Sequence, residues 1–479
     1  MMSDSNPIAA LLLPFELVSA IFILCLPLRR RVKPHPNRTP LNLASVCAQW
    51  RAVALAIPEL WTSIYLTFSG QDAYDGIPVL FGCIESIDLE DHAAALMDLW
   101  FTRAAGHPIS ISLTCAKHHS LPKRVLETLV KYRDQWGRIE LRVSSSDFLA
   151  FNEVTGPFSS LTSLRIEVID FLPRSPLLAV SALETSERLT SYELSDGGNN
   201  PVTPDTLVRV PRTLVAAKIS CQQSFAWSQN GFGAMDIGGF FSPLLEHLHH
   251  LRHLDVSIGH HGPRPDAKRL HASLITLRLG HDNLLPFLSI PTLQHLHTYL
   301  TSAIYLMSFI QHSQCRLISL SVSLYWLTKG AWVSCLAALP ELETLLITVI
   351  DHSAVQRCEV LLDDPELVPR LRSLVLKEEY TLVPRFDQWL ALLGSRSGIR
   401  HALLHVWPRH AHERRCMSPA PPEVESGLER LARGGMDVRL ITPRYQYPWN
   451  AEELDPVGDL DPKPDGPLLD LRPYHFSPF

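Results

Sequence analysis

Short segments in which apolar and polar positions alternate recur along the middle of the chain. The recurring phrase is a leucine, two residues, an apolar residue, one residue and a second apolar residue, as in Leu161 to Ile166. Clear copies begin at Leu161, Leu251, Leu274, Leu317, Leu342 and Leu371, and weaker copies begin at Leu189, Leu214 and Leu293. The last two apolar positions of each phrase alternate with polar ones, so they point to the same face of a short strand. The phrase therefore predicts one strand per copy.

Successive copies begin 19 to 37 residues apart, and most spacings fall within or near the period of roughly 20–29 residues that is typical of leucine-rich repeats. A single strand of this kind cannot bury its apolar face alone, whereas stacked repeats share a continuous core. The segments Tyr299–His312 and Trp326–Ala338 carry helical patterns. We therefore expect an α/β fold, an irregular leucine-rich-repeat solenoid with a parallel concave sheet and convex helices. The alternative is a set of unrelated buried strands in an α/β domain.

The segment 11–67 has a helical pattern instead. Pro14 can occupy the first turn of a helix, where its missing N–H costs nothing, and Leu17, Ile21 and Leu24 follow at helical spacing. Pro27 ends that helix. The segment Leu28–Thr39 has five lysine or arginine residues and two prolines, which predicts an exposed loop. A second apolar face follows, formed by Leu43, Val46, Cys47 and Trp50.

Four zones divide the chain: 1–10 is a flexible N-terminus, 11–67 is helical, 68–407 carries the repeats, and 408–479 is a proline-rich, acidic C-terminal segment. The last zone holds 12 of the 37 prolines, and six acids and one lysine stand between Glu452 and Asp465. The stretch from Glu452 to Asp465 is therefore predicted to be disordered or to act as a flexible cover.

Composition narrows the class of protein. The formal net charge of −6 argues against nucleic acid as a partner, because such proteins usually carry a basic excess. The nine cysteines are scattered, which argues against disulfide frameworks and metal clusters and favours a reducing compartment, cytoplasmic or nuclear. The apolar run Ile8–Leu28 contains Pro14 and Glu16 and lacks a basic region before it, so we expect no membrane span.

No pattern of catalytic residues stands out. The chain contains no GxSxG, P-loop or HExxH sequence, and we expect no catalytic residue and no cofactor. One stretch is dense in histidine, with His247, His249, His250, His253, His260 and His261. No cysteine or paired carboxylate stands close to complete a zinc site, so surface histidines are the preferred interpretation and we expect no metal.

Two stretches of the helical zone resemble the F-box. The first is Leu13-Pro-Phe-Glu-Leu17 followed by Ile21-Phe22 and Leu26-Pro27, and the second is Val46-Cys-Ala-Gln-Trp50-Arg51 followed by Pro58-Glu-Leu-Trp61. Together with the repeats, the chain resembles fungal, basidiomycete-type F-box proteins with leucine-rich repeats. It departs from the repeat of that family in lacking asparagine eight residues after the first leucine, where Ile169 and Asp282 are examples of what stands instead.

The resemblance implies a three-helix F-box that docks on a Skp-family adaptor, which links it to a cullin–RING complex, while the repeats bind a protein substrate for ubiquitin transfer. Such a protein is a non-catalytic substrate receptor. The alternative is a repeat scaffold without a ligase role. The resemblance gives as adaptor-binding residues Leu13, Pro14, Glu16, Leu17, Ile21, Val46, Trp50, Pro58, Leu60 and Trp61. We expect Leu13, Pro14 and Glu16 as contacts and Trp50 and Cys47 in the core, and Trp61 has the alternative role of sealing the F-box against the first repeat.

The polar residues between the apolar pairs of each phrase are candidates for substrate binding. They are Arg165, Glu193, Lys218, Asp255, Arg278 and His297, with His253 and His295 beside them. Because the row mixes both signs of charge, it favours polar, directional recognition over an apolar groove. The alternative is a solvated strand face with no fixed partner.

Overall fold

The structure is a computed structural model, and it divides into two compact units that we describe separately. Unit 1 comprises Met1–Leu345 and Glu366–Arg370, and unit 2 comprises Leu346–Pro365 and Leu371–Phe479. The structure describes residues 13–27, 31–68, 86–116, 120–152, 154, 158–169, 183, 186–196, 211–221, 249–258, 269–270, 273–324, 327–349, 359–364, 366–378, 386–406, 421–442 and 445–447.

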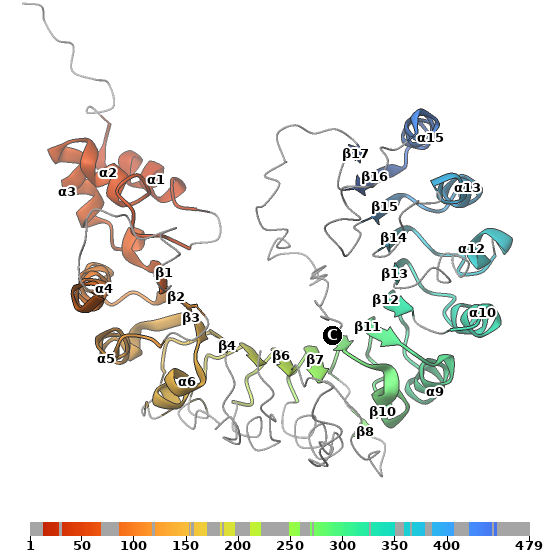
Figure 1. Ribbon diagram of the computed structural model, residues 1–479, viewed down its shortest axis with the longest axis horizontal. Coiled ribbons are helices and arrows are strands. Elements are labelled where there is room, and N and C mark those ends of the chain that lie inside the picture. The colour runs from red at the N-terminus through yellow and green to blue at the C-terminus, as the bar shows by residue number, and fades with distance from the viewer. Residues whose placement is uncertain are drawn as a thin grey trace, which may run out of the picture. The chain divides into compact units, whose positions relative to one another are not determined.

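Unit 1 begins with three helices, and Figure 1 shows them beside the first strand. They are α1 (Phe15–Leu24), α2 (Leu41–Val46) and α3 (Ala48–Ala56), followed by the 3-10 turn η2 (Pro58–Trp61). Helix α1 begins directly after Pro14, as its sequence predicts, and it ends before Pro27 because proline cannot continue a helix. The predicted helical zone is therefore confirmed as a set of short helices.

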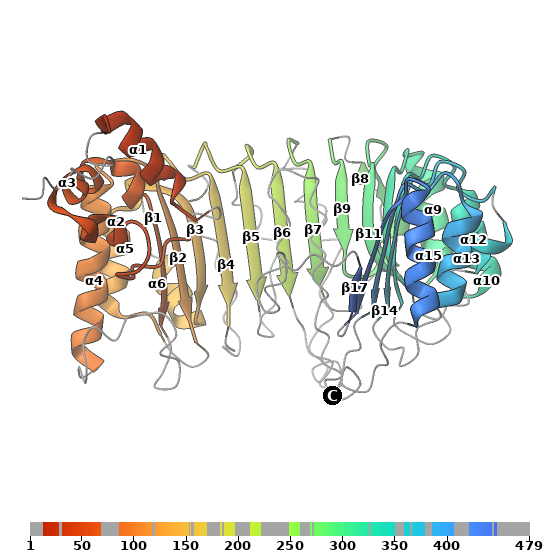
Figure 2. The same cartoon turned by 90° about the horizontal axis from the view of Figure 1, so that it is seen from above.

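The repeats form one strand each. The strands of unit 1 are β1 (Ser63–Phe68), β2 (Ile109–Cys115), β3 (Trp136–Val143), β4 (Ser163–Val168), β5 (Ser191–Asp196), β6 (Ala216–Cys221), β7 (His253–Ile258), β9 (Thr276–Leu279), β11 (His295–Leu300) and β12 (Ser319–Leu324). They lie side by side in this order, and every neighbouring pair is parallel (Figure 2). The two short strands β8 (Arg269–Leu270) and β10 (Leu288–Ser289) pair separately. The predicted parallel sheet is confirmed, and each of the weaker phrases also forms a strand.

Helices cover one face of this sheet. They are α4 (Ser86–Arg103), α5 (Lys123–Lys131), α6 (Ser145–Asn152), α9 (Ala303–Ser313) and α10 (Lys329–Ala337), with the 3-10 turns η3 (Arg133–Gln135) and η6 (Asp282–Phe287). In Figure 1 they lie on the outer side of the strands of unit 1. The apolar strand residues on that side, such as Leu164, Ile166 and Val168, are buried. We call the opposite side, which carries the polar strand residues, the open strand face.

Asp282 holds two successive repeats together. Its carboxylate is buried and accepts hydrogen bonds from the backbone N–H groups of Thr301 and Ser302 at 2.7 and 2.8 Å, and from the Thr301 hydroxyl at 2.7 Å. These donors lie at the turn that precedes α9, so the carboxylate satisfies backbone groups that would otherwise be buried without partners. Asp282 occupies one of the positions at which the sequence lacks the asparagine of the family repeat.

Unit 2 continues the alternation of strands and helices. It contains α12 (Val360–Asp363), β14 (Ser373–Glu378), α13 (Phe386–Ser395), β15 (His401–Val406), α15 (Pro422–Arg433), β16 (Asp437–Thr442) and β17 (Tyr445–Tyr447), and β13 (Thr344–Val349) runs from one unit into the other. Strands β14, β15 and β16 pair in parallel, and β17 is antiparallel to β16.

The boundary expected at residue 408 is therefore wrong for part of the C-terminal zone. Residues 421–442 form a further helix and strand, because Val424 and Leu428 on α15 and Val438 and Leu440 on β16 bury their side chains in unit 2. The acidic stretch from Glu452 to Asp465 lies outside the described residues.

Candidate functional site

Helix α1 exposes most of its apolar side chains. Only Val18 and Phe22 are buried, and Phe22 packs edge-on against Trp50 of α3 with 5.1 Å between ring centroids. The exposed apolar side chains on and beside α1 are Leu13, Phe15, Leu17, Ile21, Ile23 and Leu24. A helix that is apolar on all sides is normally buried on all sides. The exposed side of α1 is therefore a surface suited to a partner.

Helices α2 and α3 also carry exposed apolar side chains. Val46 is 60% exposed and Leu55 is 41% exposed. Of the ten exposed large hydrophobic residues in the described part of the chain, eight belong to residues 13–55. We call these eight the apolar face: Leu13, Phe15, Leu17, Ile21, Ile23, Leu24, Val46 and Leu55.

The predicted adaptor-binding residues divide between the surface and the interior. Leu13, Pro14, Glu16, Leu17, Ile21 and Val46 are exposed, and Trp50 and Pro58 are half-buried. The expectation that Trp50 and Cys47 belong to the core holds only in part, because both are half-buried. Cys47 caps α3, since its sulfur accepts a hydrogen bond from the Trp50 backbone N–H at 3.4 Å.

Leu60 and Trp61 are internal residues, so their assignment as surface contacts is wrong. Both have no exposed surface. The Trp61 indole N–H donates to the Ala54 carbonyl at 2.9 Å, and its ring meets Trp100 of α4 edge-on at 4.8 Å. The guanidinium of Arg103 lies over the same ring, 4.4 Å from its centroid. Trp61 therefore seals the helices against the first repeat.

Residues 31–40, which lie between α1 and α2, are not the exposed loop that the composition of this segment predicts. Val32 is buried, and its carbonyl accepts a hydrogen bond from the backbone N–H of Tyr65 in β1 at 2.8 Å. Since β1 is the first strand of the sheet, this contact covers an edge that would otherwise expose unpaired backbone groups. Arg31 bonds both carboxylate oxygens of Glu140, at 2.7 and 2.8 Å. Lys33 lies over the ring of Tyr65. We call residues 31–40 the edge segment.

Six of the eight predicted substrate-binding residues lie in one row across the open strand face. The register places Glu140, Arg165, Glu193, Lys218, Asp255, Arg278 and His297 side by side on successive strands. A carboxylate and a cation alternate along this row, which we call the charge row.

Neighbours in the charge row form ion pairs. Arg165 approaches Glu140 at 3.3 Å and Glu193 at 3.4 Å, and Lys218 approaches Glu193 at 2.8 Å. Further along, Arg278 lies 3.7 Å from Asp255. Much of the charge is therefore neutralised within the protein, and the remaining charge depends on residues beside the row.

Two of the predicted histidines lie in a second row. His253 and His295 flank Thr276 on successive strands, next to the charge row. Burial lowers the pKa of both imidazoles, and the nearby Arg252 lowers that of His253 further. Both are therefore neutral at pH 7. His249 and His250 are exposed, while His247, His260 and His261 lie outside the described residues.

Several charged residues that lie beside the charge row or begin it were not identified from the sequence. Arg31 and Glu140 begin the series of ion pairs, and Arg138 and Arg142 flank Glu140 on β3. On β3, the charged residues Arg138, Glu140 and Arg142 alternate with the buried Ile139 and Leu141. This alternation is the sequence signal that could have identified the three charged residues.

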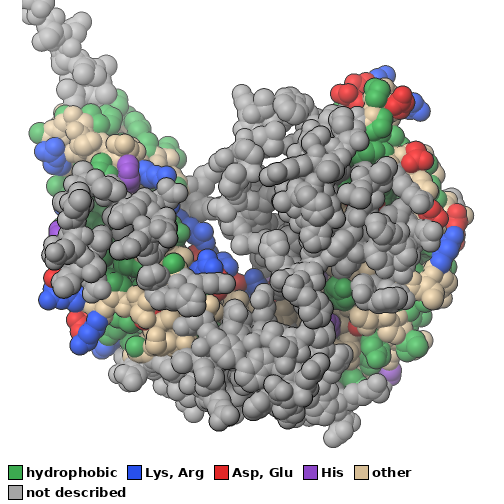
Figure 3. All heavy atoms as spheres, in the orientation of Figure 1, with side chains coloured by type: hydrophobic (Ala, Val, Ile, Leu, Met, Phe, Trp, Pro, Cys, Tyr) green, Lys and Arg blue, Asp and Glu red, His purple; other side chains and the backbone are tan. Residues whose placement is uncertain are grey.

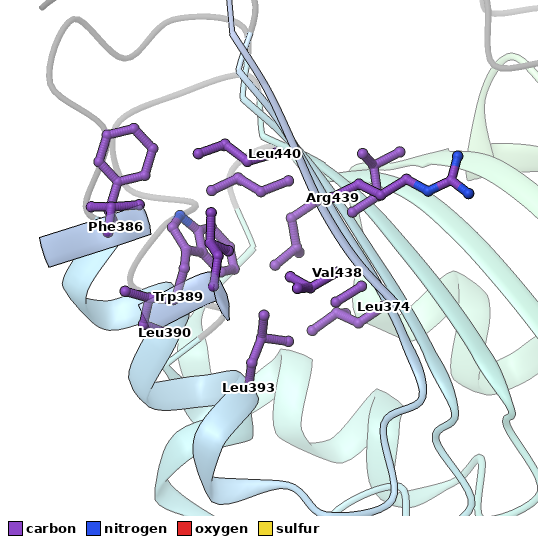
Figure 4. Close-up of a pocket in the computed structure, with 14 residues that line it drawn as sticks. Leu374, Phe386, Trp389, Leu390, Leu393, Val438, Arg439 and Leu440 are labelled. Atoms are coloured by element: carbon purple, nitrogen blue, oxygen red, sulfur yellow. The ribbon is translucent and has the colours of Figure 1, made fainter. Parts of the chain in front are cut away.

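The cavity in unit 2 is not suited to a polar substrate. It has a volume of about 20 Å³, room for little more than one water molecule. Leucine, valine and aromatic side chains from β14–β16, α13 and α15 line it, and the guanidinium of Arg439 points away from it (Figure 4). Among the described residues, no group of three histidine, cysteine or acidic side chains is placed to hold a metal ion. None of the described helices is both long and apolar enough to cross a bilayer.

Comparison with known proteins found no matching protein-family model and no matching curated protein. Among solved structures, a Bacteroides fragilis protein is similar with 12% identity and a TM-score of 0.34, over 59% of this chain and 76% of that one. The leucine-rich repeat-containing protein LegL7 from Legionella pneumophila is similar with 12% identity and a TM-score of 0.32, over 62% of this chain and 96% of that one. The leucine phrase and the parallel register of its strands, rather than these distant similarities, give the chain a leucine-rich-repeat architecture.

Proposed function

We propose that the chain is the substrate receptor of a Skp–cullin–F-box ubiquitin ligase. The observation that carries the proposal is the apolar face, which lies on the helices whose sequence resembles the F-box. Exposed apolar side chains concentrated in one small region are typical of an interaction surface. The proposed occupant of this surface is a Skp-family adaptor.

The energetics favour a partner that covers α1. Burying an exposed leucine or isoleucine side chain stabilises a complex by about 1.5–3 kcal/mol at full burial. Leu17 and Ile21, 53% and 44% exposed, stand one turn apart on α1. A few such side chains are enough to anchor an interface, because binding energy concentrates in a small central set.

In this proposal the protein performs no bond chemistry. The helices attach to the adaptor, and the open strand face of the same unit binds the substrate. The contact between Trp61 and Trp100 fixes the helices to the first repeat, so the two binding surfaces keep a set separation. The receptor would accelerate ubiquitin transfer by raising the effective concentration of the substrate near the conjugating enzyme.

A pull-down with a Skp-family adaptor from the same source tests this proposal. The test variant is the double substitution Leu17→Glu and Ile21→Glu, which places two charges on the apolar face. The matched control is Ile304→Glu on α9, because Ile304 is also an exposed isoleucine, at 75%, and lies outside the helices at the start of the chain. Circular dichroism checks that all proteins are folded.

We expect the wild type and the control to retain the adaptor and the double variant to lose it. A folded wild-type protein that fails to bind the adaptor would contradict the proposal. Equal binding by the wild type and the double variant would place the adaptor elsewhere and would also contradict it.

A further inference from the structure

One end of the open strand face carries an excess of positive charge. Over β1 to β4, the cations are Arg31, Lys33, Arg138, Arg142 and Arg165, and the carboxylates are Glu140 and Glu167. Five cations and two carboxylates leave a charge of +3, in a chain whose formal net charge is −6. We call these five cations the basic patch. Figure 3 shows Lys and Arg side chains gathered on the inner side of this region.

The contacts show which of these charges remain available. Glu140 is shared between Arg31 and Arg165, and Glu167 lies 3.1 Å from Arg142. Lys33 and the exposed Arg138 have no ion-pair partner among the residues that the structure describes. The basic patch therefore has cationic groups left to bind an anion.

The rest of the open strand face is balanced. From β5 to β9, Glu193 and Asp255 are matched by Lys218 and Arg278. The excess of positive charge is thus confined to the end of the sheet that adjoins helices α1 to α3. The edge segment supplies two of the five cations of the basic patch. A sheet edge needs only backbone pairing to be covered, so the placement of Arg31 and Lys33 there adds charge that coverage alone does not require.

We propose that the basic patch binds an acidic peptide segment of the substrate. This inference rests on the proposed function, because it takes the bound peptide to be part of the substrate. It adds to that function the chemical class of the segment that is recognised. Glutamate and aspartate side chains suit the patch because arginine forms charge-assisted hydrogen bonds with carboxylates, and one guanidinium nitrogen of Arg31 already donates to both carboxylate oxygens of Glu140. The open strand face also offers serine and threonine hydroxyls, including those of Ser110 and Thr114 on β2.

A peptide fits this surface better than a nucleic acid does. Glu140 and Glu167 stand among the arginines, and they would repel a continuous line of phosphates. A peptide can place separated carboxylates at the cations and neutral residues at the carboxylates. Nucleic-acid surfaces also commonly carry a domain-wide basic excess, which this chain lacks.

Fluorescence anisotropy with the full-length chain and no adaptor tests the inference. The probe is a labelled peptide of alternating glutamate and glycine, and the comparison probes are the same peptide with glutamine or lysine and a single-stranded oligothymidine. Because no adaptor is present, the result is independent of whether the helices bind one.

We expect the glutamate peptide to bind, the glutamine and lysine peptides to bind at least tenfold more weakly, and the affinity to fall as salt rises. The double variant Lys33→Glu and Arg138→Glu should weaken binding by about tenfold, because it reverses the two charges of the basic patch that have no ion-pair partner among the described residues. The control Lys123→Glu, an 89% exposed lysine on α5 on the helix-covered side of the sheet, should leave binding unchanged.

Three results would overturn the inference. One is equal binding of the glutamate and glutamine peptides, or no binding of either. Another is binding that the double variant leaves intact. The third is binding of oligothymidine in place of the peptide, which would assign the patch to nucleic acid. Circular dichroism of the double variant, with Lys33→Gln and Arg138→Gln as a milder second variant, separates lost binding from lost folding.

Discussion

The rings of Trp61 and Trp100 meet edge-on, with 4.8 Å between their centroids, and both are buried. Trp61 ends the helical region and Trp100 belongs to the first long helix after β1, so this pair joins the proposed adaptor-binding helices to the repeats. The Trp100 indole N–H also donates to the Ser63 carbonyl at the start of β1, at 3.0 Å.

Replacing Trp61 by alanine should destabilise unit 1 strongly. The change removes the contact with Trp100, the hydrogen bond to Ala54 and the support for Arg103. Large aromatic-to-alanine changes in a core cost about 3–5 kcal/mol of unfolding free energy. Urea denaturation measures this cost, with Leu17→Ala as the control, since Leu17 is exposed and its loss should change stability by about 0.5 kcal/mol or less. Equal costs for the two variants would contradict the account of the junction.

The ion pair between Arg31 and Glu140 should be weak and sensitive to salt. The Arg31 side chain is 38% exposed, and a single guanidinium nitrogen makes both contacts with the carboxylate. Exposed pairs contribute about 0.2–1 kcal/mol, and salt screens them. A double-mutant cycle with Arg31→Gln and Glu140→Gln should give a coupling in that range at low salt and a smaller one at 1 M salt. A coupling unchanged by salt would show that the pair is desolvated, contrary to this description.

Removing the carboxylate of Asp282 should lower the stability of unit 1. Asp282→Ala leaves the backbone N–H groups of Thr301 and Ser302 without their acceptor, and an unsatisfied buried donor costs about 1–3 kcal/mol. Asp282→Asn retains one oxygen acceptor and should cost less than the alanine variant. Thermal or urea unfolding of the two variants gives the comparison, and the reverse order of stability would contradict the proposed role of the carboxylate.

Unit 2 should lose stability as the pH falls through the range below neutrality. Burial, together with the neighbouring Lys377 on β14, lowers the pKa of His405 to about 4. An imidazole in the unfolded chain has a pKa near 6.5. Between about pH 6.5 and 4 the unfolded state therefore binds a proton that the folded state excludes, and stability falls by up to about 1.4 kcal/mol per pH unit.

The substitution His405→Asn should reduce this dependence on pH. Hydrogen exchange of the β15 backbone amides at pH 7 and at pH 5 reports the stability of unit 2 separately from unit 1. If the two proteins lose protection equally between these values, His405 does not titrate in the way described.

Much of the fold could be predicted from the leucine phrase because it encodes which strand face is buried. Leu189, Leu214 and Leu293 mark strands even where the phrase is weak. The leucine phrase does not identify the strands β15 and β16. Ala402 and Val438 stand there at positions that leucine holds in other repeats, although both side chains are buried in the same way.

The candidate site was predictable only in part. The polar positions between the apolar pairs identified the charge row, but the neutralisation of Arg165 by Glu140 and Glu193 depends on strand register, which no local pattern contains. The edge segment was read as a solvated loop because its prolines and basic residues are typical of loops. The edge segment is partly buried because it lies against the edge of β1, and the sequence pattern does not indicate that contact.

The formation of a complex with the adaptor and a cullin–RING scaffold tests the central claim most directly. Size-exclusion chromatography with light scattering, on the full-length chain mixed with a Skp-family adaptor and its cullin–RING partner, reports the mass of what forms. We predict a single complex containing all the components, and its absence with Leu17→Glu and Ile21→Glu. A folded wild-type chain that binds the adaptor but excludes the cullin, or that binds neither, would contradict a ligase receptor and leave an interaction scaffold.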